Sequence, residues 1–393
     1  MPQQRLIVLS RLFAKLGIIG FGGPQAHIAM VSDEAVDRRG WLTAAQFSDG
    51  LAVCEMLPGP ASTQLGIYIG YVYGGWAGAL VAGVSFIAPA FVIVVALAWV
   101  YFRFAQLPQL EALFFGLAPV MIAIILGFCW KLGRKSLKDA VGIAIALSAF
   151  LISSFTALST LLMFVMFGLI GLLVYSRDAI ALLTIPLLVQ TPPTASEPLS
   201  QSSVWGTERI VSFWGPLLFF FLKVGAFIFG GGLVIIPLLE FEVVDRLHWL
   251  TRSEFIDGIA IGQLSPGPVV ITAAFVGYKV AGVLGALIST IGIFTPSFVF
   301  ILLAAPVLLR LRENQSVQAF LHGVRPAVLG AIAAAAVPLS ETAFLQSSVP
   351  LSGLAIAIGL AALAAIIRFR VTTWKLILAG GLVGLVGYPL LAG

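Results

Sequence analysis

The chain has 393 residues, of which 60% are hydrophobic and 10% are charged, and its formal net charge is +5. Soluble domains carry about 25% charged residues, so this composition excludes a soluble globular fold and predicts a polytopic α-helical membrane protein. The positive charge does not indicate nucleic-acid binding, because Lys and Arg collect in the cytoplasmic loops of membrane proteins. Cys54 and Cys129 lie in apolar surroundings and predict buried thiols rather than a disulfide.

The first apolar segment carries Lys15 and then the glycine cluster "FGGPQ" (21–25). Adjacent glycines followed by proline break a helix. Unwound backbone inside a membrane is tolerated where it is buried or lines a cavity, and half-helix N-termini attract anions. We therefore expect an anion site here, with tight glycine packing as the alternative. Lys15 either faces the anion or extends its amine from the helix end to the membrane surface. The candidate ligands are Lys15, Gly22, Gly23, Pro24, Gln25 and His27.

A charged segment, "EAVDR" (34–38), follows the glycine cluster. Glu34 and Arg38 stand four residues apart, which places them on one face of a helix. Trp41 follows at the depth expected for a membrane interface. An amphipathic interfacial segment is the first interpretation, and a salt bridge that gates the pathway is the alternative.

The stretch "WLTAAQ" has the spacing of a capping box, with Thr43 followed by Gln46. A helix over 43–57 would be about 22 Å long at 1.5 Å per residue, short of the ~30 Å hydrocarbon core. It stops at "LPGP", and a short apolar run over 61–73 follows. This pattern predicts a helical hairpin with its tip inside the membrane, and a surface turn is the alternative. Pro60 suits the first turn of the next helix. The candidate ligands at the tip are Pro58, Gly59, Pro60, Ser62, Thr63 and Gln64.

Two carboxylates lie inside the first hairpin helix, Asp49 and Glu55. A carboxylate beside a dianion site would repel the dianion unless it were protonated. Glu55 is therefore a candidate for proton coupling, or a neutral hydrogen-bonding group, and Asp49 is a second coupling candidate.

Apolar runs long enough to be membrane helices follow at 77–102, 110–130 and 139–154 with 157–175. The basic stretch "KLGRKSLK" (131–138) predicts a cytoplasmic loop. Whether 178–190 crosses the membrane is left open. The polar stretch over 191–209 predicts a linker.

The remainder of the chain repeats the first part. A shift of 208 residues places Lys15 on Lys223, and 12 of the 24 positions in 37–60 are identical in 245–268. We assign a first repeat at 1–190 and a second at 210–393, whose further apolar runs are 280–303, 351–367 and 371–391. The equivalent ligand candidates are Lys223, Gly230, Gly231, Gly232, Gln263, Pro266, Gly267, Pro268 and Thr272, and Asp257 is the equivalent coupling candidate.

Basic residues suggest that the two repeats face opposite sides of the membrane. In the first repeat, the loop after 77–102 carries only Arg103, and the next loop, 131–138, carries four basic residues. In the second repeat, the loop after 280–303 carries Arg310 and Arg312, and the next loop, 339–350, carries no basic residue. This exchange predicts an inverted-topology repeat. We expect an all-α membrane protein of about 10–13 transmembrane or re-entrant helices. Inversion would bring Lys15 and Lys223 toward the midplane from opposite faces, where an anion is their simplest partner.

Motifs of several other classes of protein are missing from the sequence. There is no phosphate-binding loop, no His-Glu pair with zinc spacing and no nucleophile elbow. We therefore expect neither an enzyme nor ATP coupling, and no cofactor or metal. His248 and His322 are interpreted as structural.

The motifs "FGGPQAHI", "RRGWLTAAQFSDGLAVCEMLPGP", "FGGG…IPLLE" and "GQLSPGPVVITAAFVGY" resemble the chromate ion transporter family. The resemblance covers roughly 10–130 and 218–340. It implies a multi-pass protein of the prokaryotic inner membrane that exports chromate and whose partners are the bilayer and the oxyanion, with a homodimer left open. The residues alone predict an anion transporter. Sulfate or another oxyanion, an anion channel and a non-transporting scaffold are the alternatives.

The family pattern carries over to particular residues of both repeats, and Glu55 departs from it, because the family typically has a neutral amide there. The matching residues are Phe21, Gly22, Gly23, Pro24, His27, Trp41, Pro58, Gly59, Pro60, Phe229, Gly230, Gly231, Pro237, Trp249, Gln263, Pro266, Gly267 and Pro268.

Overall fold

The computed structural model describes residues 2–21, 23–104, 107–156, 158–175, 203–229, 231–312 and 314–392. These residues form fourteen α-helices with short π- and 3₁₀-helical segments, and they contain no β-strand. The predicted all-α class is confirmed. Gly22, Gly230, the 178–190 segment and residues 191–202 of the predicted linker lie outside the described residues, and the linker's last residues, 207–209, already belong to a helix.

The helices of the first repeat follow the predicted runs closely. They are α1 (Pro2–Ile19), α2 (Pro24–Ser32), the π-helix η1 (Asp33–Arg38), α3 (Ala44–Met56), α4 (Ala61–Phe104), α5 (Pro108–Ser136), α6 (Ala140–Phe155) and α7 (Thr160–Tyr175). The run over 61–73 is joined to the next one, because α4 continues through a sharp bend at Gly75 (φ 63°, ψ −154°). The basic stretch predicted as a loop begins within the last turns of α5.

The second repeat has the same order of elements. They are α8 (Thr207–Gly225), η3 (Gly232–Val234), α9 (Ile235–Leu239), the π-helix η4 (Glu240–Arg246), α10 (Arg252–Leu264), η5 (Val269–Ile271), α11 (Thr272–Arg312), α12 (Gln315–Phe344), α13 (Val349–Phe369) and α14 (Thr373–Ala392). In α11 the bend falls at Ala281 and Gly282, as Gly75 does in α4.

Six helices in the described part of the chain are long and apolar enough to cross a membrane. They lie at Ala61–Phe104, Pro108–Arg134, Val269–Leu303, Gln315–Phe344, Val349–Phe369 and Thr373–Leu391. The shorter apolar helices α6 and α7 match the predicted runs 139–154 and 157–175. The span at Gln315–Phe344 was not among the predicted runs, since alanines and charged residues dilute its hydropathy.

The segment from α1 to η1 turns back rather than continuing across the membrane. Near the start of α1, the Arg5 guanidinium lies 5.4 Å from the centre of the Tyr73 ring. Trp41, just after η1, stacks on the same ring with centroids 4.2 Å apart. Both ends of the segment therefore lie against one residue, and the glycine cluster forms the turn of a hairpin. The sequence predicted a broken helix at this point but not the reversal.

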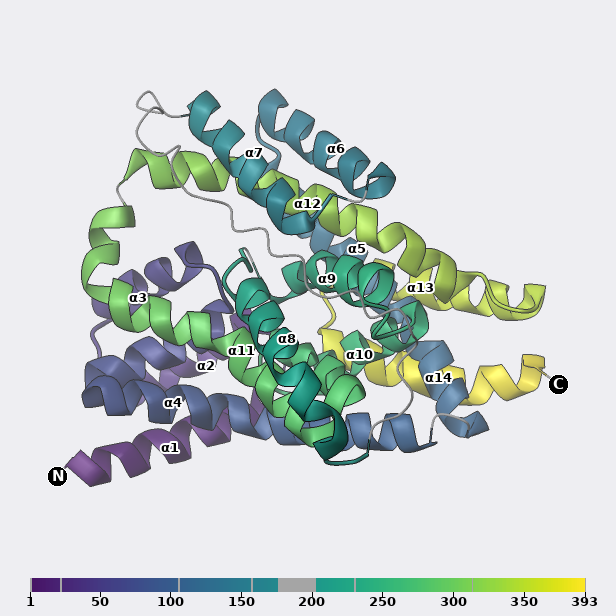
Figure 1. Ribbon diagram of the computed structural model, residues 1–393, viewed down its shortest axis with the longest axis horizontal. Helices are drawn as coiled ribbons and strands as arrows, with labels where there is room; N and C mark the ends of the chain where they lie inside the picture. The colour runs from purple at the N-terminus through teal and green to yellow at the C-terminus, as the bar shows by residue number, and fades with distance from the viewer. Residues whose placement is uncertain are drawn as a thin grey trace.

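The two repeats interlock through α5 and α12 (Figure 1). In the first repeat, α5 packs against α13 and α14 of the second, while α12 of the second repeat packs against α6 and α7 of the first. Glycines permit the close approach. A Cβ atom on Gly323 of α12 would collide with the Phe167 carbonyl of α7, and one on Gly116 of α5 would collide with the Gly380 carbonyl of α14.

Contacts between the repeats are reciprocal around their centre. Gly59 of the first Pro-Gly-Pro tip lies against Ser297 of α11, and Gly267 of the second tip lies against Ala90 of α4. Gly59 and Gly267 are equivalent in the repeat, as are Ala90 and Ser297. Such an exchange of equivalent contacts is what an approximate two-fold axis between the repeats produces, and an inverted repeat requires such an axis.

Candidate functional site

Each Pro-Gly-Pro tip meets the glycine-rich turn of the other repeat. The Gly59 N–H donates to the Ile228 carbonyl across 2.7 Å. On the opposite side, His27 Nε2 lies 3.0 Å from the Pro266 carbonyl oxygen. Four chain reversals, two from each repeat, thus lie together at the centre of the molecule. The sequence predicted two hairpin tips and two broken helices separately, and the structure brings them into contact.

Both glycine clusters are non-helical in the part that the structure describes. Between α1 and α2, Gly23 has φ 77°, and Gly231 ahead of η3 has φ 134°. Backbone with these angles strongly favours glycine. Gly232 begins η3, where a Cβ atom would lie 2.9 Å from Val269 Cβ, so it serves close packing. Pro24 begins α2, and the Gln25 side chain is exposed.

His27, a predicted anion ligand, is buried with 1% exposure. Its Nε2 atom lies within hydrogen-bonding distance of the Gly20 and Pro266 carbonyl oxygens. The ring thereby joins the first glycine turn to the second tip, so this nitrogen is not available to an anion. Its Nδ1 atom is buried without a hydrogen-bond partner.

The two tips differ in their buried polar atoms, because those of Ser265 and Thr272 at the second tip are hydrogen bonded. Around the first tip, Thr63, Gln64 and Ser297 are fully buried, and Thr63 Oγ1, Gln64 Oε1 and Ser297 Oγ lack hydrogen-bond partners. Gln64 Nε2 donates to the Pro58 carbonyl at 2.7 Å. The second tip leads instead into Val269–Ile271. Two hydroxyl groups and one amide oxygen without hydrogen-bond partners therefore lie at the first tip, where the sequence predicted Thr63 and Gln64 but not Ser297.

The prolines that end the tips stand just before the next helices. Pro60 precedes α4 and accepts from the Thr63 and Gln64 N–H groups, so it caps the helix instead of occupying its first turn. Pro268 likewise precedes η5, and the Ile271 N–H donates to its carbonyl. Ser62 is buried, and Thr272 Oγ1 is taken by the Val269 carbonyl at 2.9 Å.

Arg325 is a charged residue near Glu55 that was not among the residues predicted from the sequence. It lies inside α12, is half-buried, and is close enough to Glu55 for their charges to interact. Glu55 itself is exposed and stands three residues before Pro58. The signal was present in the sequence, because Arg325 is a single cation within a candidate membrane span, and such residues are functional candidates by default.

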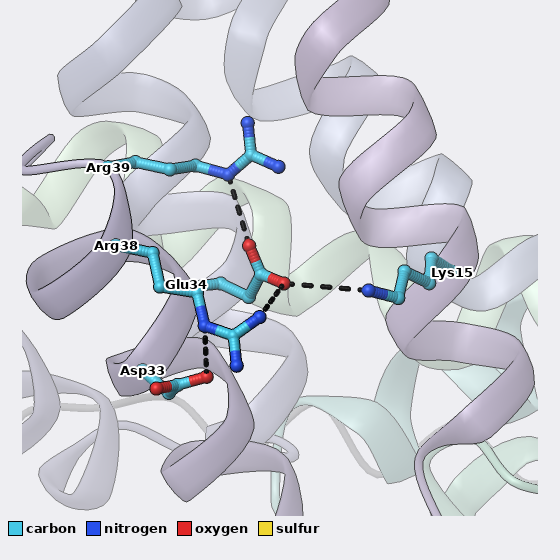
Figure 2. A network of polar contacts seen from close by, with 5 residues as sticks. All are labelled: Lys15, Asp33, Glu34, Arg38 and Arg39. Atoms are coloured by element: carbon cyan, nitrogen blue, oxygen red, sulfur yellow. Dashed lines mark hydrogen bonds and ion pairs between the residues drawn. The ribbon is translucent and has the colours of Figure 1, made fainter.

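The Lys15 ammonium faces a carboxylate of its own repeat (Figure 2). Its Nζ atom lies 3.6 Å from Glu34 Oε1. Arg38 Nη1 lies 3.6 Å from the same oxygen, and Arg39 Nε donates to Glu34 Oε2 at 3.1 Å. Burial raises the pKa of Glu34, but Arg39, Lys15 and Arg38 outweigh it and lower that pKa below its ordinary value. The predicted one-turn pair of Glu34 with Arg38 is confirmed, within a larger network.

The second repeat reproduces this arrangement around Glu242. Lys223 Nζ lies 3.8 Å from Glu242 Oε1, and Arg246 Nη1 donates to Glu242 Oε2 at 3.1 Å. The sequence indicated an anion as the simplest partner of Lys15 and Lys223, whereas in this structure each lysine forms an ion pair with a protein carboxylate. The sequence could not show this, because the partners lie about twenty residues away along the chain.

The remaining coupling candidates occupy unlike environments. Asp257 is buried and accepts a hydrogen bond from the Tyr101 hydroxyl at 2.7 Å, at the edge of a cavity of about 360 Å³. Asp49, its equivalent, is exposed. Gln263, the equivalent of Glu55, is half-buried near the end of α10. The repeat has thus diverged at its titratable positions.

Comparison with known proteins assigns both repeats to one family. The family model "Chromate transporter" matches residues 7–172 and 215–385. The chain is 34% identical to the chromate transport protein of Cupriavidus metallidurans, over 99% of this chain and 95% of that protein. It is 33% identical to a probable chromate transport protein of Synechococcus elongatus (86% of each) and 32% identical to a chromate transport protein of Pseudomonas aeruginosa (96% and 91%). No solved structure matches.

Proposed function

The chain belongs to the chromate transporter family, and we propose that it is a secondary transporter that exports chromate across the inner membrane of a prokaryotic cell. The observation that carries the proposal is the meeting of four chain reversals, with buried hydroxyls that lack partners at the first tip and with Arg325 close enough to Glu55 for their charges to interact. A dehydrated dianion needs both positive charge and hydrogen-bond donors, and this centre supplies both.

In the proposed bound state, the Arg325 guanidinium faces the oxyanion, and the hydroxyls of Thr63 and Ser297 donate to it. Glu55 is the internal anion near Arg325 when no substrate is bound. Chromate displaces this interaction, because a dianion interacts more strongly with the guanidinium than a single carboxylate does. The Lys15 and Lys223 networks remain candidates for attracting the anion toward the centre.

Access to this centre requires movement of the hairpins. Thr63 and Ser297 are fully buried, so no anion reaches their hydroxyls in this conformation. Rocking of one repeat against the other would open the tip to alternate sides of the membrane, as in other inverted-repeat transporters. A negative interior favours expulsion of a dianion by about 2.3 kcal/mol per charge per 100 mV.

The first test is a flux assay with purified protein in proteoliposomes and labelled chromate or sulfate. We expect saturable chromate flux and a rate at least about tenfold lower in Arg325→Gln, since a hydrogen bond to a charged group is worth about 1.5–3 kcal/mol. Arg368→Gln removes an exposed cation at the end of α13 and serves as the matched control. Equal rates in Arg325→Gln and wild type would exclude the guanidinium as a ligand, and absence of flux in wild type would exclude transport.

Two further measurements separate the alternatives. Substrate on the trans side accelerates uptake by a carrier and does not accelerate uptake by a channel, so counterflow distinguishes the two. Export is tested in inside-out membrane vesicles, which accumulate chromate if the protein moves it out of the cell. Faster flux of sulfate than of chromate at equal concentration would assign sulfate as the preferred oxyanion.

A further inference from the structure

We propose that Glu240 is a proton-binding site that controls the start of α10, the helix that carries the second Pro-Gly-Pro tip. The proposal rests on the proposed transport function for its effect on flux, because that tip is part of the candidate anion site. The protonation itself can be measured without transport.

Glu240 lines a cavity of about 270 Å³ between the two repeats. Ser153, Ser154 and Thr160 of the first repeat form one side of the cavity. Residues of η4, of the first turn of α10 and of α12 from the second repeat form the other side. The cavity therefore lies where the hairpin of α6 and α7 meets the second repeat.

The Glu240 carboxylate is buried and incompletely paired. The residue is 6% exposed, and its Oε1 atom has no hydrogen-bond partner. Arg252 Nε lies 3.7 Å from that oxygen, too far for a hydrogen bond, whereas Arg252 Nη2 donates to Asp245 Oδ1 at 2.6 Å. Arg252 is therefore paired more closely with Asp245 than with Glu240. Protonation of Glu240 would remove the buried negative charge that Arg252 does not fully balance.

Two charged groups face Glu240 across this cavity, Asp245 from η4 and Arg252 from α10. The lining from α6, α7 and α12 contributes hydroxyls, alanines and prolines, and no further charge among the described lining residues. Glu240 lies outside the six candidate spans. Burial raises its pKa to about 7, the Asp245 charge acts in the same direction, and Arg252 opposes them. The carboxyl group therefore changes charge near neutral pH.

Arg252 connects this proton to the anion site. It is the first residue of α10, and that helix runs for 13 residues to Leu264, two residues before Pro266. Ionised Glu240 attracts Arg252. Protonation of Glu240 removes this attraction, so that Asp245 is then the remaining carboxylate paired with Arg252. The position of the first turn of α10 therefore depends on pH, and the second tip, at the other end of this short helix, moves with it.

The first repeat lacks the carboxylate and the arginine that form this proton site. At the positions equivalent to Glu240 and Arg252 it has Ser32 and Ala44. Its Asp37 is equivalent to Asp245 and is exposed. The proton site is therefore confined to one half of the molecule, and Asp37→Asn offers a matched control that removes a carboxylate from the corresponding π-helix.

The test compares chromate flux in proteoliposomes from about pH 6 to about pH 8, with equal pH on both sides. A group with a pKa of about 7 passes from about nine-tenths to about one-tenth protonated over this interval. We expect the wild-type rate to change by up to about tenfold. Glu240→Gln should keep the wild-type low-pH rate throughout, and Asp37→Asn should follow wild type. Glu240→Gln with an unchanged pH dependence would overturn the proposal.

Thermal unfolding in detergent separates this proposal from the transport proposal. Because the pKa of Glu240 is raised in the folded state, its protonated form is the stabilising one, and wild type should lose stability relative to Glu240→Gln as pH rises through about 7. Glu240→Ser, the residue of the first repeat, repeats the measurement if the Gln variant does not fold. Equal pH dependence of stability in variant and wild type would overturn proton binding even without flux. A stability difference with unchanged flux would overturn control of α10.

Discussion

Arg325 stands inside α12, where an isolated charge costs roughly 3 kcal/mol on insertion scales. Glu55 of the first hairpin helix is close enough for its opposing charge to act on Arg325. This proximity gives a physical reason for a carboxylate at position 55, where the second repeat has the amide of Gln263. In the proposed anion site, a neutral side chain at position 55 would leave the guanidinium without this internal competitor, so we expect Glu55 to weaken anion binding.

The lysine networks invite a test that separates structure from substrate binding. Lys15 is 58% exposed on its side chain, and exposed ion pairs contribute about 0–1 kcal/mol. The Glu34 side chain is 10% exposed and forms ion pairs with Lys15, Arg38 and Arg39. We therefore expect Glu34→Gln to lower the melting temperature more than Lys15→Met does, and the double variant to melt close to Glu34→Gln alone.

The same variants report on the substrate. If Lys15 only balances Glu34, chromate affinity in proteoliposomes should be equal in Glu34→Gln and in the double variant. A weaker affinity in the double variant would restore Lys15 as an anion ligand, as the sequence first suggested.

At the scale of elements, local chemistry fixes the hairpin helices. The predicted helix over 43–57 is found at Ala44–Met56, and both capping boxes form, Thr43 with Gln46 and Thr251 with Glu254. Capping depends on residues three apart, so a sequence shows it directly. The reversal after the first glycine cluster and the carboxylate partners of the lysines depend on contacts between distant segments. Arg325 has no charged counterpart in the first repeat, where Ala118 stands at the equivalent position, so the repeat pattern did not indicate it.

Gly59 tests whether the tip requires its observed backbone. Its φ is 128°, and a Cβ atom would lie 2.5 Å from Gln64 Nε2 and from Ser297 Oγ. Backbone of this kind costs a side-chain-bearing residue about 1–2 kcal/mol before any collision. We expect Gly59→Ala to melt at a lower temperature than wild type and to lose chromate flux.

Gly215 provides the opposite case. It lies inside α8 with open space around it, so Gly215→Ala should stabilise by up to about 1 kcal/mol through helix propensity alone. If both alanine variants changed stability in the same direction, the tip conformation would not be the cause.

At the scale of the whole molecule, interlocking explains why the predicted division into sequence repeats does not correspond to separate bodies. Helices α6 and α7 belong to the first repeat by sequence but pack on α12 of the second, and α13 and α14 pack on α5 of the first. Motion of one repeat must therefore carry elements of the other. The reversals in the segments from α1 to α3 and from α8 to α10 meet at the centre, on the elements that the interlocking helices surround.

The predicted inverted orientation of the repeats can be tested at the two membrane faces. Gly40 and His248 are equivalent residues after the two π-helices, both are exposed, and both have left-handed backbone, with φ 60° and 51°. Because the equivalent position already accepts a histidine, a cysteine should be tolerated at each. We expect a membrane-impermeant maleimide to label Gly40→Cys and His248→Cys from opposite sides of oriented vesicles.

The background for this labelling is a variant in which Cys54 and Cys129 are replaced by alanine. Cys54 is buried and Cys129 is partly buried, so replacing them changes little of the exposed surface. The introduced cysteine is then the one thiol that the maleimide can label. Labelling of the two cysteines from the same side would mean that the repeats are parallel. The two tips would then enter from one face, and the proposed alternation of access around a shared centre would have no structural basis.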